Sequence, residues 1–347
     1  MIRALEKIFG WVSPDISLDL GSYTTTALVG GQGKVFSEPT YVAFERSHNR
    51  VVAVGAMAKA LAGRTLSNIE VVRPVREGVL ADFDSAEIFI KHTLRLINAK
   101  GVAAPRIVVG VPVGASDVEC RAAAEAARAA GARTVYIIPQ LLASAVGAGA
   151  AVMDPRGQMV LNIGGETVQV GVISMGNIIV SEGVRWGSGR FDECLVAFFR
   201  NKFNHLVDAA NAEELKIKIG STPGEDGAAK ADICGLDLNS GLPRAISVDS
   251  DAIAEQLAGP LDEIAQMLKR VLEMTPPELA EDIMENGCLL CGAGSLLRGM
   301  DRYLSRASGI YCYRAEDPAI SSVVGAEQVL RDPLLLRSML SRSLLSL

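Results

Sequence analysis

The sequence LDLGSYT at residues 18–24 recurs, with similar residues at most positions, as LNIGGET at residues 161–167. In both places an apolar segment leads into a glycine turn, and a second apolar segment follows at residues 25–29 and 168–173. Apolar runs on either side of a turn of small residues are typical of a β-hairpin. The sequence therefore predicts two similar hairpins, one in each half of the chain.

Two further pairs of segments follow in the same order. The sequence LLASAVGA at residues 141–148 resembles AISSVVGA at residues 319–326, and both patterns predict a helix that packs through small residues. The third pair is looser and matches a strand followed by a helix: residues 107–112 and 118–130, then residues 288–291 and 296–307. Three matched elements predict a duplicated α/β chain with two similar lobes.

Length and composition agree with this organisation. A chain of 347 residues is long enough for two domains, and 49% hydrophobic but only 5% aromatic residues indicate a large aliphatic core. A net charge of −6 without a basic run argues against nucleic-acid binding. The six cysteines lack the spacing of a secreted disulfide framework. Cys288 and Cys291 fit buried small hydrophobic residues better than a metal or redox pair, so a cytoplasmic protein is expected.

The two glycine turns carry groups that bind phosphate. Backbone N–H groups at a glycine turn form a concave site for oxyanions. The hydroxyl groups of Ser22, Thr24, Thr25 and Thr167 are further donors, and Asp19 is a candidate Mg²⁺ ligand through water. Either turn alone also fits an ordinary hairpin, but the paired occurrence favours nucleotide binding.

A third glycine turn, GAGS at residues 292–295, precedes the predicted helix at residues 296–307. Helix N-termini attract anions, and the lack of bulk suits contact with a nucleoside. The alternative is a tight turn from strand to helix that needs only small residues.

Several segments together resemble the MreB branch of the actin superfamily. They are DLGS at residues 19–22, RPVREGVLADF at 73–83, VPVGA at 111–115, FDE at 191–193, AEELK at 212–216, PPELA at 276–280 and EDP at 316–318. The resemblance extends along nearly the whole chain. It implies a duplicated ribonuclease-H-like (actin-like) α/β fold, with two lobes around a nucleotide cleft and a smaller inserted subdomain in each lobe.

The resemblance also implies domain boundaries and ligands. Residues 1–12 would form an amphipathic helix. The first lobe would comprise residues 13–150 with an insertion at about 31–75, and the second lobe residues 151–318 with an insertion at about 182–248. Residues 319–347 would return to the first lobe and end in an apolar tail. The ligands would be ATP and Mg²⁺.

Individual site residues follow from the same resemblance. The first phosphate loop would contain Ser22, Tyr23 and Thr24, and the second Gly164, Gly165, Glu166 and Thr167. Residues near the adenosine would be Glu213, Glu214, Leu215 and Lys216, and the turn closing over it would be Gly292, Ala293, Gly294 and Ser295. A solvated helix face is the alternative for Glu213, Glu214 and Lys216.

The chain departs from the MreB pattern at acidic positions. MreB proteins usually carry two Glu residues where this chain has Pro139 and Gln140, and an Asp where it has Asn162. Glu166 replaces a glycine of the second phosphate motif. A glutamine can orient a water molecule but is a poor base, so we expect Gln140 to be the catalytic residue of a slow ATPase at most. The alternative is a set of neutral substitutions in a working ATPase.

Both termini have apolar patterns. At the N-terminus an apolar helical face is predicted, formed by Ile2, Leu5, Ile8, Phe9 and Val12. Such a helix can lie in the bilayer interface, as the N-terminal helix of many MreB proteins does, or can pack on the protein's own core. Leucines are interspersed with Arg331, Arg337 and Arg342 near the C-terminus, which fits either a second membrane or partner contact or packing on the body of the protein.

The function implied is that of an ATP-binding cytoskeletal filament that controls bacterial cell shape and guides cell-wall synthesis. Its partners would be further copies of itself, the inner membrane and cell-wall morphogenesis proteins, and its location would be the cytoplasmic face of that membrane. A specialised filament, for example for organelle positioning, remains an alternative. A small-molecule kinase of the same superfold would need a catalytic base, and Asn162 stands where an acid would help. An Hsp70-like chaperone would need a substrate domain after the nucleotide domain.

Overall fold

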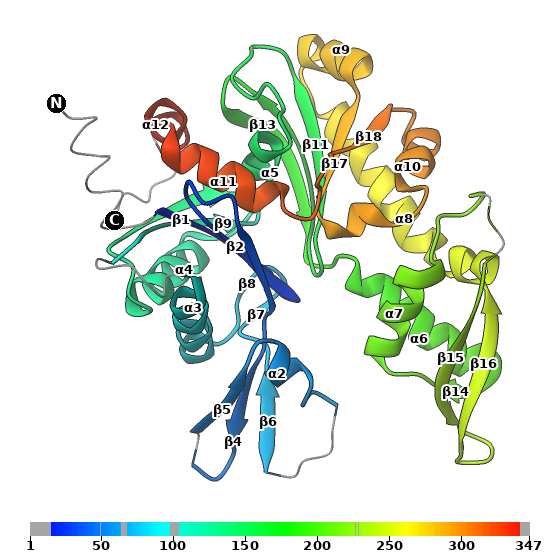
Figure 1. Ribbon diagram of the computed structural model, residues 1–347. Helices are drawn as coiled ribbons and strands as arrows, with labels where there is room; N and C mark the ends of the chain where they lie inside the picture. The colour runs from blue at the N-terminus through cyan, green and yellow to red at the C-terminus, as the bar shows by residue number, and fades with distance from the viewer. Residues whose placement is uncertain are drawn as a thin grey trace. The chain divides into compact units, whose positions relative to one another are not determined.

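The computed structural model of the protein describes residues 15–48, 50–63, 68–97, 104–225, 227 and 229–340, except for the side chain of Leu340. The chain divides into two compact units (Figure 1). Unit 1 comprises Met1–Pro155, Ile173–Ile178 and Ile320–Leu347, and unit 2 comprises Arg156–Val172 and Ile179–Ala319. The expected N-terminal helix at residues 1–12 and the last part of the apolar tail, residues 341–347, lie outside the described residues.

Unit 1 is built on a five-stranded sheet with the order β10-β9-β1-β2-β3. The strands are β1 (Asp15–Leu20), β2 (Thr24–Val29), β3 (Val35–Pro39), β9 (Arg106–Val111) and β10 (Thr134–Pro139). The first predicted hairpin is confirmed, because β1 pairs antiparallel with β2. On its other side β1 runs parallel to β9, which runs parallel to β10. Apolar residues such as Ile16 and Leu18 are fully buried in this sheet.

Helices cover the sheet of unit 1. They are α3 (Phe83–Ile97), α4 (Asp117–Ala129), α5 (Gln140–Gly147), α11 (Ser321–Arg331) and α12 (Pro333–Leu340). Helix α4 begins in a capping box, in which Ser116 and Glu119 each bind the other's backbone N–H. Its alanine-rich face is buried against the sheet, so the short side chains allow close packing.

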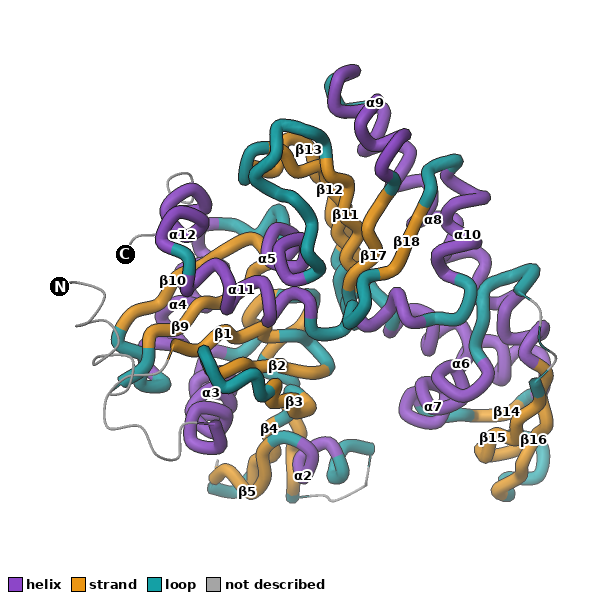
Figure 2. Tube along the Cα trace, turned by 45° about the horizontal axis from the view of Figure 1, so that its top comes forward, coloured by secondary structure: helices purple, strands orange, loops and turns teal. Residues whose placement is uncertain are grey.

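Helices α5 and α11 pack backbone against backbone, as the small-residue patterns predicted (Figure 2). A Cβ atom on Gly147 would lie 1.9 Å from the carbonyl oxygen of Ser321. A Cβ atom on Gly325 would lie 1.8 Å from the carbonyl oxygen of Ala143. Both positions therefore require glycine, and the two helices are held at a fixed separation.

A smaller insertion in unit 1 follows β3. It contains a three-stranded sheet with the order β5-β4-β6 and a two-stranded sheet β7-β8. Its elements are β4 (Val42–Glu45), β5 (Arg50–Val54), α2 (Ala56–Lys59), β6 (Ile69–Val72), β7 (Val75–Arg76) and β8 (Val79–Leu80). Gly55 is the N-cap of α2, and the Glu38 carboxylate accepts a hydrogen bond from the N–H of the first helical residue, Ala56, at 2.8 Å.

Unit 2 contains a second five-stranded sheet, with the order β13-β12-β11-β17-β18. Its strands are β11 (Gln158–Ile163), β12 (Val168–Ser174), β13 (Asn177–Val184), β17 (Cys288–Cys291) and β18 (Cys312–Arg314), and the turn between β12 and β13 is assigned to unit 1. Its large helices are α6 (Gly189–Phe203), α8 (Ser250–Glu273), α9 (Pro277–Asn286) and α10 (Met300–Ser308). The predicted buried strand at residues 288–291 is confirmed, since all four side chains of β17 are buried.

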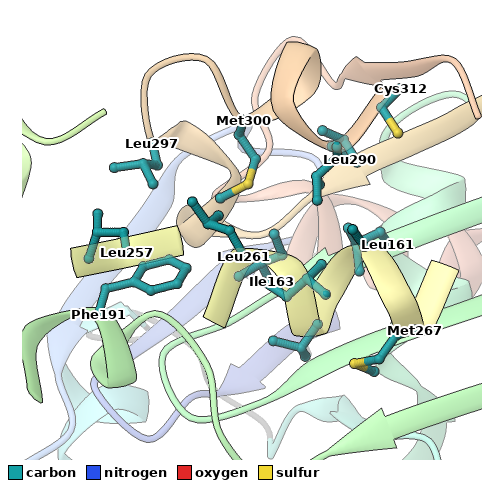
Figure 3. Close-up of a cluster of buried hydrophobic side chains, with 14 of the residues drawn as sticks. Leu161, Ile163, Phe191, Leu257, Leu261, Met267, Leu290, Leu297, Met300 and Cys312 are labelled. Atoms are coloured by element: carbon teal, nitrogen blue, oxygen red, sulfur yellow. The ribbon is translucent and has the colours of Figure 1, made fainter. Parts of the chain in front are cut away.

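The core of unit 2 lies between this sheet and its helices. Figure 3 shows Leu161 and Ile163 of β11 among side chains from α6, α8, β17 and α10. Phe191 of α6 and Leu257 of α8 are 1% and 0% exposed, so this core fixes the end of β11 relative to the start of α6. A smaller lobe of the unit contains α7 (Ala209–Ile219) and the sheet β14-β15-β16, with bounds His205–Leu206, Lys230–Asp237 and Pro243–Asp249.

The predicted start of the helix at residues 296–307 is wrong. The glycine turn leads into a short 3₁₀ helix, η1 (Ala293–Leu296), and α10 begins only at Met300. Leu297 is extended, and Gly299 has a φ of 80°, which interrupts right-handed helix. The anion-attracting N-terminus of a long helix is therefore not present at residues 292–295. Among the described helices, none is both long and apolar enough to cross a membrane.

Candidate functional site

The first glycine turn, residues 21–23, joins β1 to β2 in unit 1. A Cβ atom on Gly21 would lie 2.3 Å from the Thr24 carbonyl oxygen, so only glycine allows the chain to reverse so tightly. Ser22 is 5% exposed, and its Oγ accepts a hydrogen bond from the Gly78 N–H at 3.1 Å. Because that bond uses a lone pair, the Ser22 O–H proton can still be donated to a ligand.

Buried hydroxyl groups hold this turn from behind. The Thr40 hydroxyl donates to the Gly21 carbonyl oxygen at 2.7 Å and lies 2.8 Å from the Thr25 hydroxyl. The Thr40 N–H donates to the Tyr23 carbonyl oxygen at 3.0 Å. Thr25 is fully buried, so its hydroxyl supports the turn and is not the phosphate donor that we expected from the sequence. Thr24 is exposed at the start of β2.

Asp19 lies on β1, two residues before Gly21, and the residue as a whole is partly buried. The side-chain amide of Gln140, at the start of α5, donates to Asp19 Oδ1 at 2.7 Å. Burial raises the pKa of the Asp19 carboxyl above its ordinary value, while the hydrogen bond from Gln140 acts against that rise. The structure therefore brings together the predicted metal ligand and the predicted catalytic residue.

The surroundings of Asp19 show whether this residue could help to bind Mg²⁺. Within the described part of the chain, no three His, Cys, Asp or Glu side chains are close enough to hold a metal ion together. Magnesium commonly uses one or two carboxylates and takes its remaining ligands from water and phosphate. Asp19 fits that limited role, because it offers one carboxylate beside a turn with phosphate-binding groups.

The second glycine turn, residues 164–167, joins β11 to β12 in unit 2. The Gly164 N–H donates to the Thr167 carbonyl oxygen at 2.8 Å and closes the turn. The N–H groups of Ser188 and Gly189, where α6 begins, donate to the carbonyl oxygens of Gly164 and Gly165 at 2.9 Å each. With its carbonyl groups held in this way, the turn is positioned by α6.

Gly187 allows this contact. A Cβ atom on Gly187 would lie 2.4 Å from the Gly164 carbonyl oxygen and 2.8 Å from the carbonyl group of Gly165. Any larger residue would push α6 away from the turn. Within the sequence GSG at residues 187–189, the packing therefore requires the small residue at position 187.

A cavity of about 390 Å³ opens beside this turn within unit 2. Its size is in the range of small-molecule sites. Its lining comes from α6, α7 and the segment after β17: Ser188, Phe191, Glu213, Lys216, Ile217, Lys218, Gly220, Ala293, Gly294, Leu296, Leu297 and Arg298. The mixture of apolar walls and a few charged groups suits a flat polar ligand such as a nucleoside.

An ion pair fixes one wall of the cavity. Lys216 Nζ lies 2.7 Å from Asp192 Oδ1 and donates to the Ser188 carbonyl oxygen at 3.2 Å. Burial raises the pKa of Asp192 to about 6, the Lys216 ammonium opposes the rise, and Glu213 and Glu193 add to it. Lys216 therefore connects α7 to the start of α6, which also holds the second glycine turn.

Some of the residues predicted to contact adenosine lie elsewhere. The cavity is lined by Glu213, Lys216, Ala293 and Gly294 but not by Glu214 or Leu215. Leu215 points into the core of unit 2 and Glu214 is exposed, because consecutive residues of a helix face different directions. Gly292 and Ser295 shape the turn instead: Ser295 is buried and its hydroxyl donates to the Gly292 carbonyl oxygen at 2.7 Å.

Gly292 also connects this turn to the second phosphate strand. Its φ is 82°, and a Cβ atom on it would lie 2.3 Å from the Ile163 carbonyl oxygen and 2.6 Å from Asn162 Oδ1. The turn at residues 292–295 therefore contacts the end of β11 directly, and Ala293 and Gly294 line the same cavity as Glu213 and Lys216.

Sequence reasoning missed Thr40, Gly78, Asp192 and Gly187. These residues support the site through hydrogen bonds or close packing. FDE at residues 191–193 was noted only as a family motif, and nothing in the pattern indicated that Asp192 pairs with Lys216.

Comparison with known proteins agrees with this geometry. The model of the family described as MreB/Mbl protein matches residues 13–337. The cell shape-determining protein MreB of Escherichia coli strain K12 is 42% identical over 320 residues, which cover 90% of this chain and 92% of that protein. The cell shape-determining protein Mbl of Bacillus subtilis is 36% identical over 312 residues, covering 90% and 94%.

A solved structure shows the same likeness. The crystal structure of MreB5 of Spiroplasma citri bound to ADP has a TM-score of 0.88 and 30% identity, and the match covers 95% of this chain and 99% of that one. The resemblance inferred from the sequence motifs and the predicted actin-like fold are confirmed. The chain therefore belongs to the MreB/Mbl family of actin-like, cell shape-determining proteins.

Proposed function

We propose that this chain binds ATP with Mg²⁺, hydrolyses it slowly and assembles into filaments at the cytoplasmic face of the bacterial inner membrane. In this role it would act with cell-wall morphogenesis proteins to guide wall synthesis. The observation that carries the proposal lies in unit 2, where a 390 Å³ cavity adjoins the second glycine turn, whose carbonyl groups are held by the start of α6.

Nucleotide binding has support from both units. The cavity would take the nucleoside, with Glu213 and Lys216 on one wall and Ala293 and Gly294 on another. Both glycine turns would bind phosphate through N–H and hydroxyl groups, those of Ser22, Tyr23 and Thr24 in unit 1 and of residues 165–167 in unit 2, while the Gly164 N–H closes the second turn. MreB5 of S. citri, with the same fold, has been crystallised with ADP and with AMPPNP.

Mg²⁺ would neutralise part of the phosphate charge, and Asp19 is the carboxylate placed to hold it. The same region supports slow hydrolysis. An amide cannot accept a proton from an attacking water as a carboxylate can, and the Gln140 amide is already directed at Asp19. Gln140 would then orient water at most.

Filament formation and membrane attachment rest on family membership and on the apolar N-terminal pattern. The exposed Leu334 on α12, at 78%, and the nearby Arg331 and Arg337 favour a further contact with an anionic membrane.

Three measurements test the proposal. Calorimetric titration with ATP and Mg²⁺ should give a saturable heat, and a flat titration with every adenine and guanine nucleotide would contradict it. Electron microscopy of the pure protein with ATP on anionic vesicles should show lipid-bound filaments. Deletion of residues 1–12 should release the protein from the vesicles while nucleotide binding persists. Phosphate release should be slower than that of E. coli MreB assayed in parallel.

A further inference from the structure

Ser188 lies at the junction between the cavity of unit 2 and the second glycine turn. It is the N-cap residue of α6, and its N–H donates to the Gly164 carbonyl oxygen at 2.9 Å. The same residue lines the cavity of about 390 Å³. A ligand that occupies the cavity and extends toward the turn would therefore pass close to Ser188.

Both backbone polar groups of Ser188 are engaged within the protein. The N–H is bonded to the turn, and the carbonyl oxygen accepts hydrogen bonds from Lys216 Nζ and from the Phe191 N–H, at 3.2 Å each. The hydroxyl is therefore the one polar group of this residue that remains for a ligand. Because it has one donor proton and two lone pairs, it can bind either a phosphate oxygen or a sugar hydroxyl.

The side chain of Ser188 does not cap α6. A serine at an N-cap normally has an extended backbone and accepts a hydrogen bond from an N–H of the first helical turn. Ser188 instead has φ and ψ of −61° and −18°, which are helical values, and its side chain makes no capping bond. Among the described residues, none forms a hydrogen bond with this hydroxyl.

Backbone carbonyl groups cap α6 in place of a side chain. The N–H groups of its first three residues, Gly189, Arg190 and Phe191, donate to the carbonyl oxygens of Gly165, Gly187 and Ser188 at 2.9, 3.0 and 3.2 Å respectively. These are donors that a helix cannot satisfy from within its own turns. Because they are already satisfied, the Ser188 hydroxyl is not needed for capping and is left beside the cavity.

Ser188 is held in place from two sides. The second glycine turn binds its N–H, and Lys216 binds its carbonyl oxygen. Lys216 is itself fixed, because its ammonium also donates to Asp192 Oδ2 at 2.9 Å in an ion pair that is largely buried. A group that is already positioned loses little freedom when a ligand binds, so the hydroxyl can add to the affinity.

We propose that the Ser188 hydroxyl binds the nucleotide at the point where its nucleoside part joins the first phosphate group. The inference rests on the proposed function, because it requires that the cavity holds the nucleoside and that the second glycine turn binds phosphate. The ligand atom is either a sugar hydroxyl or an oxygen of the first phosphate, since a serine hydroxyl binds both. The side chain of Ser188 then contacts the ligand and has no part in holding α6.

Two substitutions at position 188 remove the hydroxyl in different ways. Ser188→Ala removes the oxygen alone, and Ser188→Gly also removes Cβ. Calorimetry with Mg²⁺ present measures the dissociation constant of ADP, and competition with ADP measures those of AMP and adenosine. Both variants should bind ADP and AMP about 5-fold or more weakly than the wild type, as expected for the loss of one hydrogen bond. An equal loss for adenosine identifies the sugar as the partner, and unchanged adenosine binding identifies the first phosphate.

Thermal unfolding without ligand separates a ligand contact from a structural role. Since Ser188 makes no capping bond, Ser188→Ala should keep the melting temperature within about 2 °C of the wild type. Ser116→Ala is the matched control, because Ser116 caps α4 and its hydroxyl accepts from the Glu119 N–H at 3.3 Å. The control should melt about 2–4 °C lower and bind ADP as the wild type does.

Four results would go against the inference. Wild-type affinity for ADP and AMP in both Ser188 variants would overturn it and leave the proposed function intact. A loss confined to Ser188→Gly would also overturn it, because the flexibility of glycine would then be the cause. A loss for ADP without one for AMP, or a fall in melting temperature as large as that of the control, would do the same. A wild type that binds no adenine nucleotide would remove the proposed function and this inference with it.

Discussion

Replacing Gly147 by alanine should destabilise unit 1, and the close contact between α5 and α11 allows the loss of stability to be estimated. The added Cβ would lie 1.9 Å from the Ser321 carbonyl oxygen. Nonbonded heavy atoms rest at about 3.5 Å, so the two helices would have to separate by roughly 1.5 Å. The obstructing atom belongs to the backbone of a helix and cannot rotate away.

Two opposing effects set the magnitude. Overpacking of a close contact costs about 1–3 kcal/mol, and a clash with backbone lies at the upper end of that range. Replacing a helical glycine with alanine stabilises the helix by about 1 kcal/mol, because alanine has the higher helix propensity. We therefore expect a net loss of about 2 kcal/mol in the free energy of unfolding, or about 4–8 °C in melting temperature for a unit of this size.

Urea unfolding followed by circular dichroism measures this loss. Gln328→Ala, at an exposed position on α11, is the control and should change the free energy of unfolding by less than about 0.5 kcal/mol. The double variant Gly147→Ala with Gly325→Ala should lose less than the sum of the two single losses, since one separation of the helices accommodates both methyl groups. A Gly147→Ala protein as stable as the control would show that the helices are not in backbone contact and would refute the reasoning.

Three further changes test the site. Thr40→Val should cost about 1–3 kcal/mol, because it leaves the Gly21 carbonyl without the Thr40 hydroxyl as its donor, and it should also weaken nucleotide binding in calorimetry. Thr93→Val, which removes a buried hydroxyl on α3 bonded to the Phe89 carbonyl, should affect stability alone. Gly187→Ala should raise the dissociation constant for ADP by about 10-fold or more, because the methyl group displaces the second glycine turn, and unchanged affinity would contradict the assigned contact. The raised pKa of Asp192, about 6, means that the folded state binds a proton more tightly than the unfolded state, so this group should make stability fall as pH rises from about 4 to 6. Asp192→Asn should remove that slope in unfolding measured across this pH range, and a slope equal to that of the wild type would assign it to other groups.

Much of the fold could be predicted because the relevant patterns are local. The hairpins at Gly21 and Gly164 follow from apolar runs around small residues, and the α5 and α11 segments follow from their small-residue patterns. The start of the helix near residue 296 could not be predicted, because it depends on the left-handed conformation of Gly299. That conformation brings the Gly299 Cα close to the side chains of Thr222 and Glu225, far away in the sequence.

The candidate site, too, could be predicted only where the pattern is local in the sequence. Glycine turns and their hydroxyl groups can be recognised from the sequence, but the residues that hold them are distant in the chain. Thr40 supports Gly21 from 19 residues away, and Gln140 reaches Asp19 across 121 residues. Leu215 was predicted to lie near the adenosine, but its side chain is buried in the core of unit 2. A family motif does not show which face of a helix a side chain occupies.

The hydroxyl pair of Thr25 and Thr40 has a mechanical consequence. Thr40 lies in the two-residue connection between β3 of the large sheet and β4 of the small inserted sheet. Through one hydroxyl and one amide it grips the carbonyl oxygens of Gly21 and Tyr23. A movement of the small sheet would therefore also displace the first glycine turn, which would contact the phosphates. Conversely, a displacement of that turn would move the small sheet through the same two hydrogen bonds.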